Sequence, residues 1–158
     1  MALVKDLLYY IVSNYPNPSH LSKARTTKLV YLSDWKHSIE YNRQITDIKW
    51  YFNNHGPFVW DVIETAEQYP ELFEIEETEN YHGEPKTLIG VNSRSYDPDL
   101  DQSERNTADQ VINATCDLQW DSFVNLVYST YPVVTTDQYE DLNLPELAGE
   151  YRESKVPA

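Results

Sequence analysis

The chain has 158 residues, of which 41% are hydrophobic and 13% aromatic, a composition that indicates one folded domain rather than a disordered segment. Its formal net charge is −14 and is unevenly spread, since residues 1–60 carry +3 and residues 61–158 carry −17. This charge argues against direct binding to nucleic acid, and the single cysteine excludes an internal disulfide and a cysteine-rich metal cluster.

The cysteine content and the distribution of apolar residues predict a cytoplasmic protein. A lone cysteine, Cys116, suits a reducing compartment. No uninterrupted apolar run approaches the roughly 20 residues needed to cross a bilayer. Residues 1–12 have neither a basic leader nor a small-residue cleavage site. We therefore expect no association with a membrane.

Two helices are predicted at the start of the chain. Apolar residues recur at helical spacing over residues 2–15, and Pro16 and Pro18 end that pattern. A second helix over about residues 20–42 is apolar on all sides at its middle. Such an apolar circumference predicts a buried central helix.

The middle of the chain is predicted to hold a short strand, a helix and a hairpin. Residues 45–52 are rich in aromatic and β-branched residues, which favours a short strand or an extended arm. Gly56 and Pro57 are expected to begin a helix that ends before Pro70, because proline suits the first helical position. Residues 72–91 place apolar residues and glutamates on either side of a turn, the pattern of a small hairpin.

Helices are expected again toward the C-terminus. A polar loop precedes a helix whose capping box is assigned to Thr107 and Gln110. A further helix covers residues 120–128, where the apolar residues again follow a helical period. After that helix the only expected element is a short helical turn near residues 145–151.

Together these elements predict an α+β fold that is mainly α with a small β element. The expected architecture is a compact helical domain with a short strand or hairpin insertion. We expect one domain over residues 1–158, because the sequence holds no internal repeats, linkers or low-complexity tracts. Its segment from about residue 132 onward is expected to be irregular.

Common catalytic motifs are absent from the sequence. The four glycines are isolated, so neither a P-loop nor a dinucleotide-binding fingerprint forms, and no G-x-S-x-G elbow occurs. Cys116 is expected to be a buried structural thiol. Asp34, His37 and Glu40 share one helix face, which leaves two alternatives, a divalent metal site or a surface or hydrogen-bonded trio. We expect no metal and no cofactor.

A run of glutamates on the predicted hairpin is the candidate partner-binding site. The site consists of Glu74, Glu76, Glu77 and Glu79, with Glu71 preceding it. Two interpretations remain open. The carboxylates either offer a basic partner a line of negative charge like that of a nucleic-acid backbone, or they form a solvated hairpin face.

Residues 26–66 carry an ordered set of motifs. They comprise a helix with Lys28, Leu29, Tyr31, Asp34, Trp35 and His37, a turn with Arg43, Ile45 and Thr46, an extended segment with Trp50 and Tyr51, and then Gly56 and Pro57. This combination resembles the diagnostic core of the Panacea domain of SocA-like antitoxins, although Asn42 stands where that family often has glycine. We expect a scaffold role for Lys28, Tyr31, Asp34, Trp35, His37, Trp50, Gly56 and Pro57, because buried aromatic residues usually serve packing.

The resemblance implies a non-enzymatic antitoxin that binds and neutralises a cognate toxin, or that delivers the toxin to a protease. The expected partner is therefore a protein, and the acidic hairpin predicts that it is basic. An alternative function is a phage or mobile-element inhibitor that blocks a nucleic-acid-binding protein by acidic mimicry of DNA. A third alternative is a metal-dependent hydrolase built on Asp34, His37 and Glu40.

Overall fold

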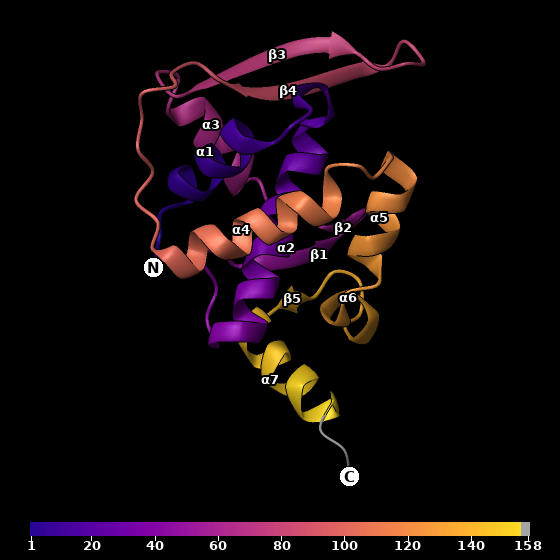
Figure 1. Ribbon diagram of the computed structural model, residues 1–158. Helices are drawn as coiled ribbons and strands as arrows, with labels where there is room; N and C mark the ends of the chain where they lie inside the picture. Colours follow the sequence, from indigo (N-terminus) through magenta and orange to yellow (C-terminus); the bar gives the residue numbers. More distant parts are fainter. Residues whose placement is uncertain (156–158) are drawn as a thin grey trace.

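The structure is a computed structural model of the chain and describes residues 1–155 (Figure 1). Its elements are, in chain order, α1 (Val4–Asn14), the short 3-10 helix η1 (Pro18–His20), α2 (Lys23–Tyr41), β1 (Trp50–Asn53), β2 (Gly56–Pro57), α3 (Asp61–Gln68), β3 (Phe73–Glu79), β4 (Pro85–Val91), α4 (Gln102–Thr115), α5 (Trp120–Tyr128), α6 (Tyr131–Thr135), β5 (Asp141–Leu142) and α7 (Leu144–Lys155). Within residues 1–155, none of the helices combines the length and the apolar character that crossing a membrane requires.

Helix α2 is the centre of the fold, and α1, α3, α4 and α7 all contact it (Figure 1). Leu29, Val30 and Tyr31 have no exposed surface, which confirms the prediction of a central helix that is apolar on all sides. The Ser22 side chain caps the first turn by accepting a hydrogen bond from a backbone N–H. Asn42 ends the helix in the left-handed conformation, with φ 62°.

The strands form two small sheets. β1 pairs antiparallel with both β2 and β5, and β3 pairs antiparallel with β4 in a hairpin. The hairpin lies across the end of the molecule that holds α1 and α3 (Figure 1). Phe73 and Ile89 are buried on its inner face, and the Ile89 N–H donates to the Leu21 carbonyl at 2.9 Å. The predicted hairpin and the mainly helical α+β fold class are therefore confirmed.

The predicted helix start at Gly56 and Pro57 is wrong. These two residues form β2, which pairs with the end of β1, and α3 begins only at Asp61. Gly56 has a φ of 93°, which lies in the left-handed region and does not continue into a right-handed helical turn. The other end of α3 agrees with the sequence, since the helix stops before Pro70.

Helix α4 begins earlier than the sequence predicted. Its capping box consists of Asp101 and Glu104, and each side chain accepts a hydrogen bond of 2.8 Å from the backbone N–H of the other. Thr107, the predicted cap, is buried within the helix. Cys116 follows the last turn and is half-buried, so the expectation of a buried thiol was also wrong.

The segment after α5 is more regular than predicted, because α6, β5 and α7 follow one another within it. Helix α7 has 12 residues and packs against α2. The Tyr151 ring meets the Trp35 ring edge-on with centroids 5.8 Å apart. Arg152 Nη1 donates to the backbone oxygens of Ser38 and Ile39 at 3.0 and 2.7 Å. These contacts with a helix more than 100 positions away in the sequence stabilise α7.

Candidate partner-binding surface

Asp34 is fully buried on α2 and is the hydrogen-bonding centre of the motif residues. Its Oδ1 accepts the backbone N–H groups of Ile45 and Thr46 at 2.9 and 3.0 Å. Its Oδ2 accepts Thr46 Oγ1 at 2.6 Å and Trp50 Nε1 at 2.9 Å. Burial raises the pKa of Asp34 to about 6, and the four donated bonds act against that rise. Because these bonds use the lone pairs of both oxygens, the carboxyl group joins the β1 segment to α2.

The aromatic residues of the motif extend this network into the core. The rings of Tyr31 and Trp50 meet edge-on with centroids 5.5 Å apart. The Tyr31 hydroxyl lies 2.8 Å from Thr130 Oγ1, between α5 and α6. The motif therefore connects α2, β1 and the segment that follows α5.

The metal-site alternative on Asp34, His37 and Glu40 is not supported, because the three side chains face different partners. His37 Nδ1 lies 2.8 Å from the Arg43 backbone oxygen, and its Nε2 lies 3.1 Å from Ser103 Oγ. Glu40 forms an ion pair at 3.0 Å with the lysine one turn before it. Across residues 1–155, no three histidine, cysteine or acidic side chains gather as a metal site would require.

All the motif residues expected to serve as scaffold lie in the interior. Lys28 is only 2% exposed, and burial lowers its pKa to about 8. Its Nζ forms no hydrogen bond or ion pair with any residue that the structure describes. Gly56 lies beside Tyr128, whose ring would be 3.4 Å from an added Cβ. The scaffold role stays a prediction that their burial favours.

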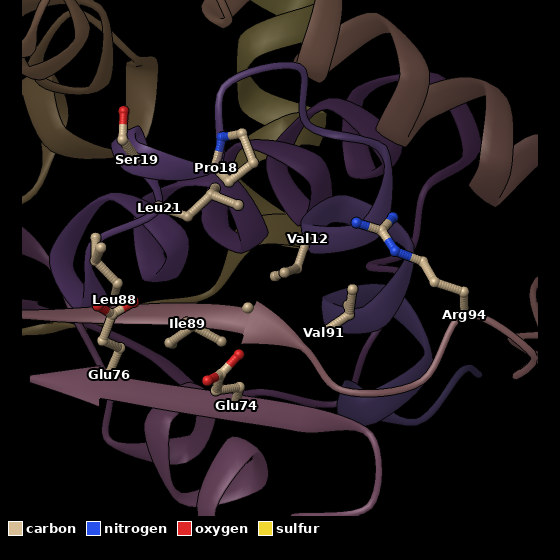
Figure 2. Close-up of a pocket in the computed structure, with 11 residues that line it drawn as sticks. Val12, Pro18, Ser19, Leu21, Glu74, Glu76, Leu88, Ile89, Val91 and Arg94 are labelled. Atoms are coloured by element: carbon tan, nitrogen blue, oxygen red, sulfur yellow. The ribbon is translucent and has the colours of Figure 1, made fainter.

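A groove of about 380 Å³ lies between the hairpin and the segment formed by α1 and η1 (Figure 2). Its apolar lining includes five Val, Leu and Ile side chains, Val12, Leu21, Leu88, Ile89 and Val91. Three of these are buried, whereas Leu88 and Val91 are half-buried and leave apolar surface open. Glu74 and Glu76 line the same groove, and Arg94 lies at one end (Figure 2). The groove fits a segment that carries both aliphatic and basic side chains.

The four glutamates predicted as one site fall into two pairs. Alternation along β3 places Glu74 and Glu76 on one face of the hairpin and Glu77 and Glu79 on the other. All four are exposed, but only the first pair lines the groove. Glu77 instead lies 3.2 Å from the Thr87 hydroxyl, which donates to it across the hairpin. The structure therefore brings two of the predicted residues to the groove and separates the other two from it.

The sequence did not reveal the apolar half of this groove. Val12 and Leu21 have the pattern of ordinary core residues, and Arg94 lies in a stretch expected to be loop. One available signal was Leu88, an aliphatic residue opposite Glu76 in the hairpin register. An apolar residue on the glutamate face of a hairpin indicates that this face is not purely a solvated one.

Comparison with known proteins identifies the family. The family model described as Antitoxin SocA-like, Panacea domain, matches residues 27–132, about two thirds of the chain. The matched part contains most of α2, the β1 and β2 strands, the hairpin, α4 and α5. Searches of curated proteins and of solved structures gave no match. The motif resemblance is thereby confirmed, and the chain belongs to the Panacea-domain family of SocA-like antitoxins.

Proposed function

We propose that the protein is an antitoxin that binds a cognate toxin protein and neutralises it by direct contact. Family membership supports an antitoxin role in general. The observation that carries the proposal is the groove, in which half-buried Leu88 and Val91 lie beside the carboxylates of Glu74 and Glu76. Apolar surface provides binding energy in protein interfaces, and charged groups at its edge provide orientation and partner choice.

The proposed partner presents a basic, partly aliphatic segment to the groove. Residues 61–104 hold 13 of the 26 acidic residues and only two basic ones, Lys86 and Arg94. This excess of negative charge around the hairpin attracts a basic partner over roughly a Debye length, about 8 to 10 Å at physiological salt. Aliphatic contacts with Leu88 and Val91 then slow dissociation.

The proposed role is binding without catalysis. The most strongly buried carboxyl group of the motif, Asp34, uses both of its oxygens for hydrogen bonds within the chain. His37 uses both ring nitrogens in the same way. The engagement of both groups in hydrogen bonds within the chain supports a binding role over general acid–base catalysis.

Co-expression with the product of the adjacent gene tests this proposal. We expect the adjacent product alone to stop growth and the pair to restore it. Leu88→Asp should abolish the rescue, because it places a charge on the apolar surface of the groove. Val134→Asp is the matched control, since Val134 is 67% exposed on α6, away from the groove. Circular dichroism would establish that both variants fold.

Two results would contradict the proposal. A pair that fails to restore growth when both proteins accumulate removes the antitoxin function. Rescue that survives Leu88→Asp, in a variant that folds, removes the groove as the toxin-binding surface while leaving the antitoxin function in place.

A second candidate is inhibition of a nucleic-acid-binding protein by acidic mimicry. The observation that favours it is the exposure of all four glutamates along β3, which leaves their carboxylates accessible. Competition separates the candidates. A mimic is displaced from its partner by duplex DNA or RNA, whereas an antitoxin that binds its toxin through the apolar groove is not displaced at the same ionic strength.

A further inference from the structure

A second cleft, of about 730 Å³, lies at the other end of the hairpin from the groove of Glu74 and Glu76. Its walls come from the hairpin turn, from the start of α2 and from the first turn of α5. Figure 1 shows the hairpin turn on the same side of the molecule as α5. The cleft is basic in a strongly acidic protein: Arg25, His20 and Lys86 line it, and Asp121 is its only acidic member among the described residues.

Arg25 supplies a fixed cation to this cleft although only 3% of the residue is exposed. Its Nη2 donates to the backbone oxygens of Thr115 and Leu118 at 2.9 and 2.8 Å, and to the Tyr15 hydroxyl at 3.1 Å. The guanidinium also lies over the Phe123 ring, 4.5 Å from its centroid. Its Nε is buried and finds no acceptor within residues 1–155, nor does any carboxylate there pair with it. Arg25 Nε is thus a buried donor without an acceptor on a residue that lines the cleft.

His20 supplies a second buried donor without a partner. The Ser19 hydroxyl donates to Asn17 Oδ1 at 2.7 Å, which fixes the orientation of the Asn17 amide. Asn17 Nδ2 then donates to His20 Nε2 at 3.1 Å. The proton of the neutral imidazole therefore resides on Nδ1, which is buried and unpartnered within the described part of the chain. Two of the orphaned donors of the structure thus border one cleft.

The remaining walls add further positive potential. Lys86 Nζ is held over the cleft by a hydrogen bond of 3.1 Å to the Ser19 backbone oxygen. Helix α5 starts here, and its N-cap residue Gln119 makes no side-chain capping bond, so the first-turn N–H groups lack a side-chain acceptor. Burial and the nearby charges of Arg25 and Lys86 lower the pKa of His20. Burial is the larger cause, and the two positive charges act in the same direction.

We propose that this cleft binds a phosphate group carried on a small molecule. Donors from η1, α2, β4 and α5 approach it from several sides, an arrangement that suits a tetrahedral group with three free oxygens better than a planar carboxylate. An unpartnered buried donor costs stability, and an anion that accepts from it removes that cost. Trp120 lines the cleft and is 44% exposed, so its indole provides a face for a planar ring attached to the phosphate.

Titration of the full chain with inorganic pyrophosphate tests the proposal. Calorimetry at constant ionic strength gives the Kd, and 15N NMR follows the backbone amides. We expect saturable shifts concentrated on the first turn of α5 and on residues 20–25. Lys86→Gln should weaken binding by about tenfold, the usual effect of losing a hydrogen bond to a charged group. Lys49→Gln makes the same change of charge at an exposed site outside the cleft and should leave the Kd within about twofold.

Adenosine monophosphate serves as the probe for the ring. It should bind more tightly than inorganic phosphate and quench the Trp120 fluorescence. Trp120→Leu should remove this gain in affinity.

The proposal is overturned if pyrophosphate produces no saturable shift at millimolar concentration, if Lys49→Gln weakens binding as much as Lys86→Gln, or if acetate binds as tightly as phosphate. None of these results affects the antitoxin function, because the cleft and the Glu74–Glu76 groove share no residue.

Discussion

Trp50 Nε1 donates a 2.9 Å hydrogen bond to Asp34 Oδ2, which joins the first strand to the middle of the central helix. Trp50 is 1% exposed and Asp34 is fully buried, so water does not compete for this bond. The same carboxyl group accepts three further bonds from Ile45 and Thr46. A buried polar network of this kind stabilises the fold only when all of its members are satisfied, and here they are.

Asp34→Asn tests the ionisation of this buried group. Because burial raises the pKa of Asp34 to about 6, above its unfolded value, the favourable contribution of the group is fully present below about pH 4 and is lost as the pH rises through 6. The free energy of unfolding of the wild type minus that of Asp34→Asn should therefore fall by up to about 3 kcal/mol between pH 4 and pH 7.

Urea unfolding across this pH range measures the difference. Asp47→Asn is the control, since Asp47 is exposed, and its difference should change little with pH. The opposite result is that the free energy of unfolding of the wild type minus that of Asp34→Asn grows with pH. In that case the four donated bonds outweigh burial, and the pKa of Asp34 is depressed.

Gly56→Ala should destabilise the fold by about 1 to 3 kcal/mol, because an alanine is strained at a φ of 93°. Its Cβ would also press on the Tyr128 ring at 3.4 Å. Gly90→Ala, in the hairpin, is the matched control. A Cβ there meets no atom within 4 Å, and the change should stay within about 0.5 kcal/mol. Thermal melts of equal midpoint for the two variants would contradict this assignment.

Trp35→Ala should lower the free energy of unfolding by about 3 to 5 kcal/mol, the usual effect of removing a buried indole. Trp35 is 6% exposed and contacts Tyr151, so the loss should also loosen α7 from α2. Trp60→Ala removes an indole that is 56% exposed and should cost less than about 1 kcal/mol. Chemical denaturation compares the two, and hydrogen exchange of the α7 amides reports the loosening. A Trp35 variant that melts like the wild type yet fails to bind the toxin would make Trp35 an interface residue.

Two double substitutions separate electrostatic steering from groove contact. Glu74→Lys with Glu76→Lys and Glu79→Lys with Glu84→Lys change the net charge equally, but only the first pair lines the groove. Both should slow association with the toxin severalfold at low salt, with the effect shrinking as salt is added. Only the first should speed dissociation. Surface plasmon resonance at two salt concentrations measures both rates. Identical dissociation rates for the two double variants would contradict a direct contact between the groove and the toxin.

The sequence predicted those helices and strands whose buried face is set by the spacing of their own apolar residues. The apolar periods of α1, α2 and α5 identify those helices because a helix buries the face that its own spacing defines. The alternation around residues 73–91 identifies the hairpin for the same reason. The ordered motif from Lys28 to Pro57 identified the family, since it records the residues that fix α2 to β1.

Where the local signal was ambiguous, distant contacts decided the outcome. Asp101 with Glu104 and Thr107 with Gln110 are both acceptable capping boxes by spacing. The ion pairs of Arg43, which follows α2, with both carboxylates of the first box at 3.0 Å favour that box. Helix α7 likewise lacks a strong apolar period and depends on its contacts with α2.

The sequence by itself determined the composition of the binding surfaces: an acidic hairpin, a basic N-terminal part and a Panacea motif. Tertiary structure decided which charges act together. Strand alternation divided the glutamates between two faces, and the packing of the hairpin on α1 supplied the apolar side of the groove. The fold also gathered Arg25, Lys86 and the start of α5 around one cleft, although these lie far apart in the chain. Charge is a property of each residue, whereas a site requires charges to be held at a few ångströms, and only packing fixes that distance.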